Sequence, residues 1–410
     1  MSKRTFSVLS LLIVASLALA SCTTGGGSTS GGTVKVVSDL PMTGSSLGQT
    51  QTIVNAIKQA FEEKSYQACS GNWKIEYEAR DDASAALGKW DPDVATANAK
   101  DYAADKSIVA VIGTYNSGAA ALEIPILNPE NLIMVSPANT YPGLTRSGPG
   151  TDEGEPDKYY PSGTRTYARV VAADHLQGSA NARWARDLGA KTIYIFDDQE
   201  LYGKGVADVV DAKAKEYGLT VLGHEGIDPK AADYKALASK IKDLNPDLIY
   251  LGMITQNNAG QLAKDLRGAG YEGLLMGPDG INEVAFVEAA GEAAEGVYVT
   301  FAGVTPDRME GDAATWRDAY KAKYGSDPEV YAVYGYVSAQ VVLDAFERVC
   351  AAGKALTDRN AVREAVLATK DLKTVLGPLS LDANGDPVSV TMSGSRVVDG
   401  KIVFQNFVEP

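Results

Sequence analysis

The sequence predicts an α/β fold made of two lobes, each a doubly wound parallel sheet. Short apolar runs rich in β-branched residues alternate with helical stretches that carry one apolar face. The alternation is interrupted by a segment rich in Gly, Pro and acidic residues, 146–163, and then begins again. With 410 residues, the chain is long enough for two lobes of ordinary domain size.

The first half of the chain supplies the first sheet. The apolar run 108–112 is too short for a buried helix and is β-branched, so it indicates a buried parallel strand. Residues 49–64 have helical spacing, with apolar side chains at Ile53, Ala56, Ile57, Ala60 and Phe61. The other strands expected here are 34–38, 73–79 and 132–135, and the other helices are 92–104 and one that ends near residue 127.

The second half repeats this order. The expected strands are 167–171, 192–196, 220–225, 248–251, 274–276 and 297–301. The expected helices are 175–188, 205–217, 234–244 and 259–268, with a short helix before the last strand. The chain then returns to long helices, 313–324, 331–351 and 359–369, and ends from residue 375 in short strands with hairpin turns. Two similar halves with a helical return indicate two lobes, more than one crossing between them, and a cleft that favours a ligand.

The N-terminus has the pattern of a lipoprotein signal peptide. Lys3 and Arg4 precede an apolar run, 8–20, which is shorter than a membrane span. The run ends in Leu19-Ala20-Ser21-Cys22, which predicts cleavage after residue 21 and lipid attachment to Cys22. The alternative is an ordinary signal peptide with a Cys there by chance. Residues 22–33 are then a lipid anchor and a flexible linker, and the protein is exported and held on the outer face of the cell membrane or in the periplasm.

Charge and cysteine content exclude some partners and leave one question open. The formal net charge is −14, and cleavage would remove two positive charges, so no nucleic-acid partner is expected. Besides Cys22 the chain contains Cys69 and Cys350, an even pair in an exported protein. They form either a disulfide or two buried thiols.

The sequence contains few of the motifs that are typical of enzymes. The two histidines, His175 and His224, have no second ligand at metal spacing, and neither a nucleophile elbow nor a Walker loop is present. Gly203-Lys204-Gly205 lacks the third glycine of a dinucleotide fingerprint. The acidic residues of 146–163 do not match a Ca²⁺ loop and indicate a solvated acidic loop instead. We therefore expect no enzyme, no cofactor and no metal site.

Candidate ligand-binding residues lie where two neighbouring strands end. Ser117 follows strand 108–112 and begins a helix, whose N-terminus would suit a carboxylate; the alternative is a plain N-cap. Ala138 and Thr140 follow strand 132–135 and offer a carbonyl acceptor and a hydroxyl. Their alternative is a turn without a ligand. Because ligands of open α/β sheets bind outside the carboxyl ends of strands, we expect the two loops to form one site.

Two residues of the second half are further candidates. Asp279 follows strand 274–276 and would provide a counter-charge for an ammonium group, although Pro-Asp-Gly is also a common turn. Tyr202 follows strand 192–196 and would close over a bound ligand, although an isolated aromatic residue beside a helix start is more often structural.

Together these residues resemble the Leu/Ile/Val-binding protein family, the solute receptors of branched-chain amino-acid ABC transporters. The resemblance covers about residues 34–407. Its markers occur in order: Val111-Ile112-Gly113 followed by Ser117, Ser136-Pro137-Ala138-Asn139-Thr140, Asp197-Asp198-Gln199-Glu200-Leu201-Tyr202-Gly203, Met276-Gly277-Pro278-Asp279-Gly280, and Gly377-Pro378-Leu379.

The resemblance implies a Venus-flytrap body of the type I periplasmic binding proteins, with a hinge of three strands. Lobe one would comprise residues 34–172 and 302–392, and lobe two residues 173–301 and 393–410. Ser117 and Thr140 would bind the α-carboxylate of an amino acid. The Ala138 carbonyl, Thr140 and Asp279 would bind its α-ammonium, and Tyr202 would cover the site on closure. Family members often have Glu where this chain has Asp279.

Other departures from the family concern the ligand side chain. Gln49 stands where well-known members have an aromatic residue, and Tyr115 and Asn116 replace residues around a family disulfide that this chain lacks. The family's Tyr-rich segment is replaced by Met253-Ile254-Thr255-Gln256-Asn257-Asn258. These changes predict a polar surface around the ligand side chain.

The function that the resemblance implies is that of a substrate-binding lipoprotein of an ABC importer. It would bind an amino acid, of branched-chain type or more polar, and deliver it to a permease driven by ATPase subunits. One alternative is a receptor that senses amides, urea or amino acids for a signalling partner. Another is a Rossmann-type enzyme, against which the missing base, metal motif and phosphate loop argue.

Overall fold

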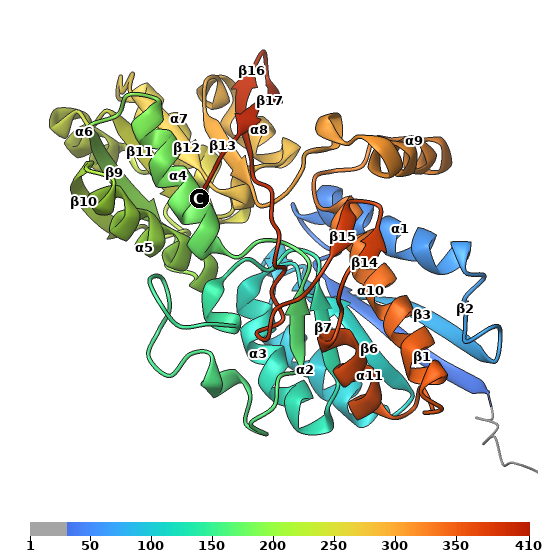
Figure 1. Ribbon diagram of the computed structural model, residues 1–410. Coiled ribbons are helices and arrows are strands. Elements are labelled where there is room, and N and C mark those ends of the chain that lie inside the picture. Colours follow the sequence, from blue (N-terminus) through green and yellow to red (C-terminus); the bar gives the residue numbers. More distant parts are fainter. Residues whose placement is uncertain (1–30) are drawn as a thin grey trace, which may run out of the picture.

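The computed structural model describes residues 31–410 and has two mixed α/β lobes (Figure 1). The predicted signal peptide, Cys22 and most of the predicted linker lie outside the described residues. Within them, no helix has the length and apolar character needed to cross a membrane. The predicted fold class, two α/β lobes with mainly parallel sheets, is confirmed.

The first sheet has six strands in the order β2-β3-β1-β6-β7-β8. All its pairs are parallel except that of β2 with β3. The strands are β1 (Gly32–Leu40), β2 (Gln67–Ala68), β3 (Trp73–Asp81), β6 (Ile108–Gly113), β7 (Ile133–Ser136) and β8 (Tyr167–Arg169). A small hairpin, β4 (Ala83–Ser84) with β5 (Lys89–Trp90), follows β3.

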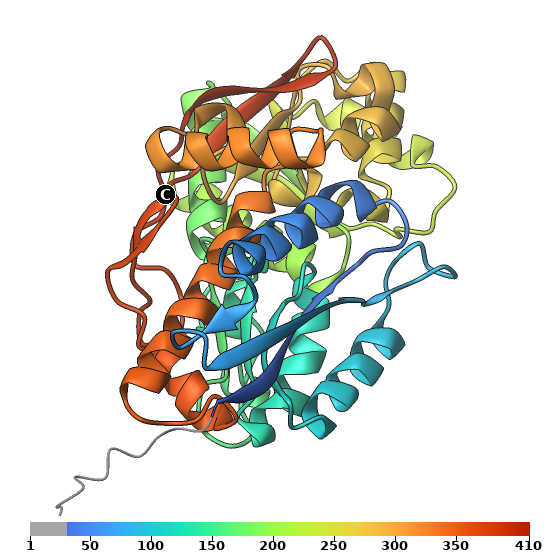
Figure 2. The same ribbon diagram turned by 90° about the vertical axis from the view of Figure 1, so that its right-hand side faces the viewer.

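Helices cover both faces of this sheet because its central strands β1, β6 and β7 are apolar on both sides. Val36 of β1 packs in the core formed with α1 (Leu47–Glu63) and α10 (Ala332–Ala351), which lie side by side (Figure 2). The neighbouring Val37 points to the opposite face, into the core formed with α2 (Pro92–Ala104) and α3 (Ser117–Leu127). Adjacent residues thus serve two cores, as expected of a strand in a doubly wound sheet.

The second sheet has seven strands in the order β10-β9-β11-β12-β13-β16-β17. Its strands are β9 (Thr192–Asp197), β10 (Thr220–Gly226), β11 (Leu248–Gly252), β12 (Leu274–Gly277), β13 (Tyr298–Phe301), β16 (Ser393–Val398) and β17 (Lys401–Phe407). The last two strands join it antiparallel. One face is covered by α4 (Asp174–Asp187) and α5 (Leu201–Glu216), the other by α6 (Lys235–Leu244), α7 (Ala259–Gly268) and α8 (Val284–Ala290).

The chain passes between the lobes three times: after β8, after β13 and before β16 (Figure 1). Between the second and third passages it returns to the first lobe as α9 (Gly311–Tyr324), α10, α11 (Arg359–Leu367) and the hairpin β14 (Leu372–Thr374) with β15 (Gly377–Leu379). A disulfide between Cys69 and Cys350 ties the β2–β3 turn to the end of α10. Of the two alternatives that the sequence left for these cysteines, the structure has the bridge.

Two local expectations were wrong. The helix predicted from residue 205 begins at Leu201, which places Tyr202 in its first turn. The segment 146–163 is not simply a solvated acidic loop, because Glu155 is only 5% exposed. Its carboxylate accepts hydrogen bonds from the hydroxyls of Tyr141 at 2.6 Å and Tyr159 at 2.5 Å, and Lys158 pairs with it. A carboxylate can be buried when it has these hydrogen-bond and charge partners. The amino-acid composition of the segment does not indicate that Glu155 has such partners.

Candidate functional site

A pocket lies between the lobes, where the ends of β6 and β7 face the beginning of α5 and the end of β12. It contains about 400 Å³ of space not filled by protein atoms, a figure that includes open solvent. Its lining consists of Tyr115, Asn116, Ser117, Gly118, Ala138, Thr140, Glu200, Tyr202, Ile254, Asp279, Gly280 and Tyr331.

The first-lobe side of the pocket offers donors for an anion. The helix α3 begins at Ser117, and no side chain caps its N-terminus. The first N–H groups of a helix have no partner within it, and with the helix dipole they favour an anion. Next to them, the Thr140 hydroxyl is buried and has no hydrogen-bond partner among the described residues. The side-chain oxygen of Asn116 is also unpartnered among the described residues, but it is an acceptor and does not contribute to anion binding.

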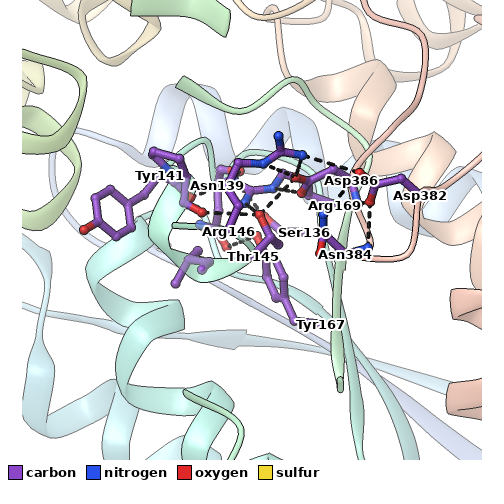
Figure 3. Close-up of polar contacts among 12 residues, drawn as sticks. Ser136, Asn139, Tyr141, Thr145, Arg146, Tyr167, Arg169, Asp382, Asn384 and Asp386 are labelled. Atoms are coloured by element: carbon purple, nitrogen blue, oxygen red, sulfur yellow. Dashed lines mark hydrogen bonds and ion pairs between the residues drawn. The ribbon is translucent and has the colours of Figure 1, made fainter. Parts of the chain in front are cut away.

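The loop that carries Ala138 and Thr140 is held by buried polar groups (Figure 3). The Ser136 hydroxyl accepts the N–H groups of Ala138 at 3.1 Å and Asn139 at 2.8 Å. Arg169, on β8, donates to the carbonyls of Asn139 and Tyr141, both at 2.9 Å. These bonds hold the backbone on both sides of Thr140.

The charge of Arg169 is balanced by a residue from far along the chain. Its Nε donates to Asp386 at 2.8 Å, and Arg146 reaches the same carboxylate at 2.7 Å (Figure 3). Burial alone would raise the pKa of Asp386, but the two guanidinium groups hold it below the usual value. Asp386 directly follows the turn Asp382-Ala383-Asn384-Gly385, in the segment after residue 375 for which only short strands and hairpin turns were expected, so this support of the loop was missed.

Asp279 supplies negative charge on the opposite side of the pocket. It is 3% exposed, and its carboxylate accepts hydrogen bonds from Gln177 and Tyr202, each at 2.6 Å, and from Tyr331. Burial raises the pKa of Asp279, although these three donors oppose the shift. A buried carboxylate without a cationic partner of its own is suited to receive a ligand cation.

A second carboxyl group lies behind the first. Asp174, at the start of α4, accepts a hydrogen bond from Gln177 at 2.7 Å, so one amide group joins Asp174 to Asp279. Burial and the charge of Asp279 raise the pKa of Asp174 well above its usual value. Its second oxygen has no hydrogen-bond partner in residues 31–410. Asp174 does not line the pocket, so it acts on a bound cation only through Gln177 and Asp279.

Comparison with known proteins identifies the chain. The family model described as "Periplasmic binding protein" matches residues 33–401, which is most of the sequence. The chain belongs to this family. It is therefore a solute-binding protein and not an enzyme, and the resemblance to the Leu/Ile/Val-binding proteins is confirmed.

Three similar proteins illustrate how far the likeness extends. Leu/Ile/Val-binding protein homolog 1 of Brucella abortus is 28% identical over 350 residues, 85% of this chain and 86% of that protein. The leucine-binding protein LivK of Thermotoga maritima is 27% identical, with a TM-score of 0.79 over 92% of this chain and 99% of that one. An R. palustris solute-binding protein in complex with benzoate is 20% identical, with a TM-score of 0.75 over 92% and 97% of the two chains, which shows the fold alone.

The structure of this periplasmic binding protein brings most of the predicted site residues together. Ser117, Ala138, Thr140, Tyr202 and Asp279 all line the pocket, as do two of the three residues to which we assigned the ligand side chain. Those two are Tyr115, whose ring packs edge-on against the ring of Tyr331 at 5.7 Å, and Asn116. The third, Gln49, is not in the lining. It is buried at the start of α10, where its Oε1 accepts the Tyr331 N–H at 3.5 Å.

The prediction that residues 253–258 give the pocket a polar surface was wrong. Only Ile254 of this segment lines the pocket. Thr255 donates to the carbonyl of Gly280 at 3.4 Å, and Gln256 donates to Glu283 at 3.0 Å, so both amide and hydroxyl are used within lobe two. The side chains that stay in the pocket wall here are aliphatic and aromatic.

Of the five lining residues of this periplasmic binding protein that were not predicted as site residues, Tyr331 and Glu200 have polar side-chain groups. Tyr331 precedes α10, where it is one of several aromatic residues with core spacing, and nothing distinguished it from them. Glu200 is the N-cap of α5 and stands inside a marker of the resemblance, yet was given no role. No group of three or more His, Cys, Asp or Glu residues in the described part of the chain is arranged to hold a metal ion.

Proposed function

We propose that this protein captures a small aliphatic amino acid of the leucine, isoleucine and valine type in the interlobe pocket. The observation that carries the proposal is that one side of the pocket has groups that favour an anion and the other side has a group that favours a cation. An uncapped helix N-terminus and the unpartnered Thr140 hydroxyl lie on one side, and the buried Asp279 carboxylate lies on the other. An α-amino acid has a carboxylate and an ammonium group separated by one carbon, and it would use both.

The assignment of groups follows from this polarity. The N–H groups at the start of α3, the Ser117 hydroxyl and the Thr140 hydroxyl would bind the α-carboxylate. Asp279 and the carbonyl of Ala138 would bind the α-ammonium. Tyr202 would contact the ligand from lobe two, so a complete set of contacts exists only when the lobes are closed, and binding shifts the population to the closed state.

The rest of the pocket favours an uncharged side chain. Ile254, Tyr115 and Tyr331 provide aliphatic and aromatic surface. Of the polar residues in the lining, Glu200 has both carboxylate oxygens bonded to Lys89 and Trp90, which leaves it less available to a ligand. The names of the relatives from Brucella abortus and Thermotoga maritima, a Leu/Ile/Val-binding protein homolog and a leucine-binding protein, support the same ligand class. In the cell, the closed protein would deliver the amino acid to an ABC permease and, through it, to ATPase subunits.

Calorimetry with leucine and two truncated analogues tests the ligand assignment. Protein freed of bound ligand by unfolding and refolding should bind leucine, isoleucine and valine at micromolar or tighter affinity, and lysine and glutamate far more weakly. The analogue 4-methylpentanoate lacks the ammonium and 3-methylbutylamine lacks the carboxylate, so each should lose most of the affinity. If benzoate or 4-methylpentanoate binds as tightly as leucine, the amino-acid assignment is wrong. Absence of binding by all twenty amino acids would reject it as well.

Membrane attachment through Cys22 is a separate part of the proposal. Cys22→Ala should release the protein into the soluble fraction, because a lipid-modified Cys with two or more acyl chains holds a protein stably on a membrane. Radiolabelled palmitate should label the parent protein and not the variant. Equal fractionation of the two proteins would show that the segment ending at Ser21 is an ordinary signal peptide.

A further inference from the structure

The two lobes are joined across the mouth of the pocket by a charged bridge. Lys89, on β5 of lobe one, donates to Oε1 of Glu200 at 2.5 Å and to Oδ1 of Asn257 at 2.6 Å, both in lobe two. Trp90, the next residue, donates its indole N–H to the other Glu200 oxygen at 3.2 Å. Both oxygens of Glu200 are therefore held by lobe one. We call this set the Lys89–Glu200 bridge.

We propose that the Lys89–Glu200 bridge is part of the ligand-capture machinery: it holds the lobes closed over the pocket and slows ligand release. The inference rests on the proposed function, because it names residues that act on the same pocket. Glu200 is itself a lining residue, so the bridge forms one wall of the site rather than a remote surface contact.

The geometry links the bridge to the two groups that hold the ligand. Glu200 is the N-cap of α5 and precedes Tyr202 by two residues, so fixing Glu200 also fixes the start of the helix that carries Tyr202. On the other side, Trp90 packs directly on Gly118. A Cβ built on Gly118 would lie 2.6 Å from the Trp90 ring, so the ring touches the anion-binding end of α3. Closure by the bridge therefore brings Tyr202 and the start of α3 together.

Neighbouring residues in each lobe orient the side chains that form the Lys89–Glu200 bridge. The Asn257 amide N–H donates to Asp198 at 2.8 Å, which turns its oxygen toward Lys89. Trp90 belongs to a small core with Ala95 and Ala119, which holds its indole at the pocket. The side chains of Lys89 and Glu200 are only 20% and 25% exposed, so water screens the pair less than it does an ordinary surface pair.

The bridge has a specific kinetic consequence. Its partners come from different lobes, so it exists only in the closed state and adds nothing to the first encounter of ligand with the open protein. Truncating one member of a partly buried charge pair acts mainly on dissociation. We expect Lys89→Met to raise koff for leucine about tenfold while kon changes less than about twofold.

Stopped-flow kinetics and small-angle scattering test the inference together. Lys89→Met and Glu200→Gln are compared with the wild type for leucine association, leucine dissociation and the radius of gyration without ligand. The charge-exchanged pair, Lys89→Glu with Glu200→Lys, should recover part of the slow dissociation. Lys35→Met is the matched control. It removes a Lys35–Asp105 pair at 2.9 Å that lies wholly within lobe one, and it should leave koff unchanged.

The outcomes separate this inference from the proposed function. A faster koff or a larger ligand-free radius of gyration in Lys89→Met and Glu200→Gln, but not in Lys35→Met, supports the bridge. Unchanged koff and unchanged radius in both variants overturns it, even if leucine binds as proposed. If the wild type binds no amino acid, the proposed function fails, and the ligand-free radius alone decides whether the bridge closes the lobes. Far-UV circular dichroism and the melting temperature establish that each variant is folded.

Discussion

The hydroxyl of Tyr331 donates a hydrogen bond to the carboxylate of Asp279 and so joins lobe one to lobe two inside the pocket. Tyr202 and Gln177 donate to the same carboxylate, each at 2.6 Å. Within residues 31–410, the negative charge is thus stabilised by three neutral donors and by no cationic side chain. A ligand ammonium group would supply the missing positive charge where both lobes meet, which connects ligand charge with lobe closure.

Asp279→Asn should weaken leucine binding by roughly 2–5 kcal/mol, because it removes the charge partner of the ammonium in a buried site while keeping the side chain's size. Isothermal titration calorimetry measures the loss. Asp265→Asn is the matched control: Asp265 is also a buried aspartate of lobe two, but it accepts the Tyr234 N–H at 2.6 Å and does not line the pocket. Equal affinity of Asp279→Asn and the wild type would remove Asp279 from the site.

The affinity for leucine should also depend on pH with a defined sign. In the ligand-free protein the pKa of Asp279 is raised above 3.8, mainly by burial, whereas an ammonium group beside it would favour the carboxylate. Affinity is then highest above the ligand-free pKa and falls as the pH drops through it, since protons compete with the ammonium. Calorimetry from about pH 4 to pH 8 measures this fall. Asp279→Asn should flatten the profile, and an equally steep profile in that variant would assign the effect to Asp174.

Thr140→Val should weaken leucine binding by about 1.5–3 kcal/mol, the usual range for a hydrogen bond to a charged group. The Thr140 hydroxyl makes no hydrogen bond of good geometry within the described residues, and its only nearby side-chain carboxyl is that of Asp174, whose pKa it helps to lower, so stability should change little. Thr166→Val offers the contrast. Thr166 is equally buried but accepts a hydrogen bond from Asn128 at 3.0 Å, so this variant should lose stability and keep its affinity. The reverse pattern would contradict the assignment.

The sequence predicted the parts of the site that depend on strand ends. Ser117, Thr140 and Asp279 each follow a short apolar strand, and parallel strands bring their carboxyl ends to one edge of a sheet. The prediction that these residues lie close together therefore required only the order of the strands and the resemblance to the Leu/Ile/Val-binding protein family. The same information could place both lobes, because alternating apolar runs determine which residues form a two-sided sheet.

The features of the site that could not be predicted from the sequence depend on how elements distant in the chain pack against one another. Tyr331 enters the pocket only because the chain returns to lobe one and brings α10 against it. Gln49 has the expected place in the chain order, but α1 turns it toward the start of α10 instead of the pocket. The contact of Lys89 with Glu200 joins residues of two different lobes that lie 111 positions apart in the chain. None of these outcomes follows from periodicity or from neighbouring residues.

Removal of the Cys69–Cys350 disulfide should reduce the free energy of unfolding by roughly 2–5 kcal/mol. The bridge spans 281 residues, and closing so long a loop restricts the unfolded chain strongly. Guanidinium denaturation of Cys69→Ser/Cys350→Ser measures the loss. Reductant should lower the midpoint of the wild type toward that of the double variant and leave the variant unaffected. Two titratable thiols in the unfolded, unreduced wild type would show that the bridge does not form.

His224 should make stability depend on pH near neutrality. Its Nε2 lies 3.2 Å from Asp197, and its Nδ1 lies 3.7 Å from Asp211 and 3.8 Å from Asp208. Burial opposes the charged imidazole, but the three carboxylates outweigh it and raise the pKa of His224 above 6.5. A raised pKa in the folded state means that the contribution is complete below the unfolded pKa and disappears as the pH rises through the folded pKa.

The difference in unfolding free energy between the wild type and His224→Gln isolates this effect. Buried carboxyl groups such as Asp198 and Glu283, whose pKa values burial raises to about 7, titrate in the same range in both proteins and cancel in the difference. The advantage of the wild type should therefore be largest near pH 5.5 and shrink toward pH 8.5. His175→Gln gives the opposite slope, because burial lowers the pKa of His175 to about 4 and its protonation costs stability as the pH falls. A pH-independent difference for His224→Gln would mean that its imidazole does not gain charge from the neighbouring aspartates.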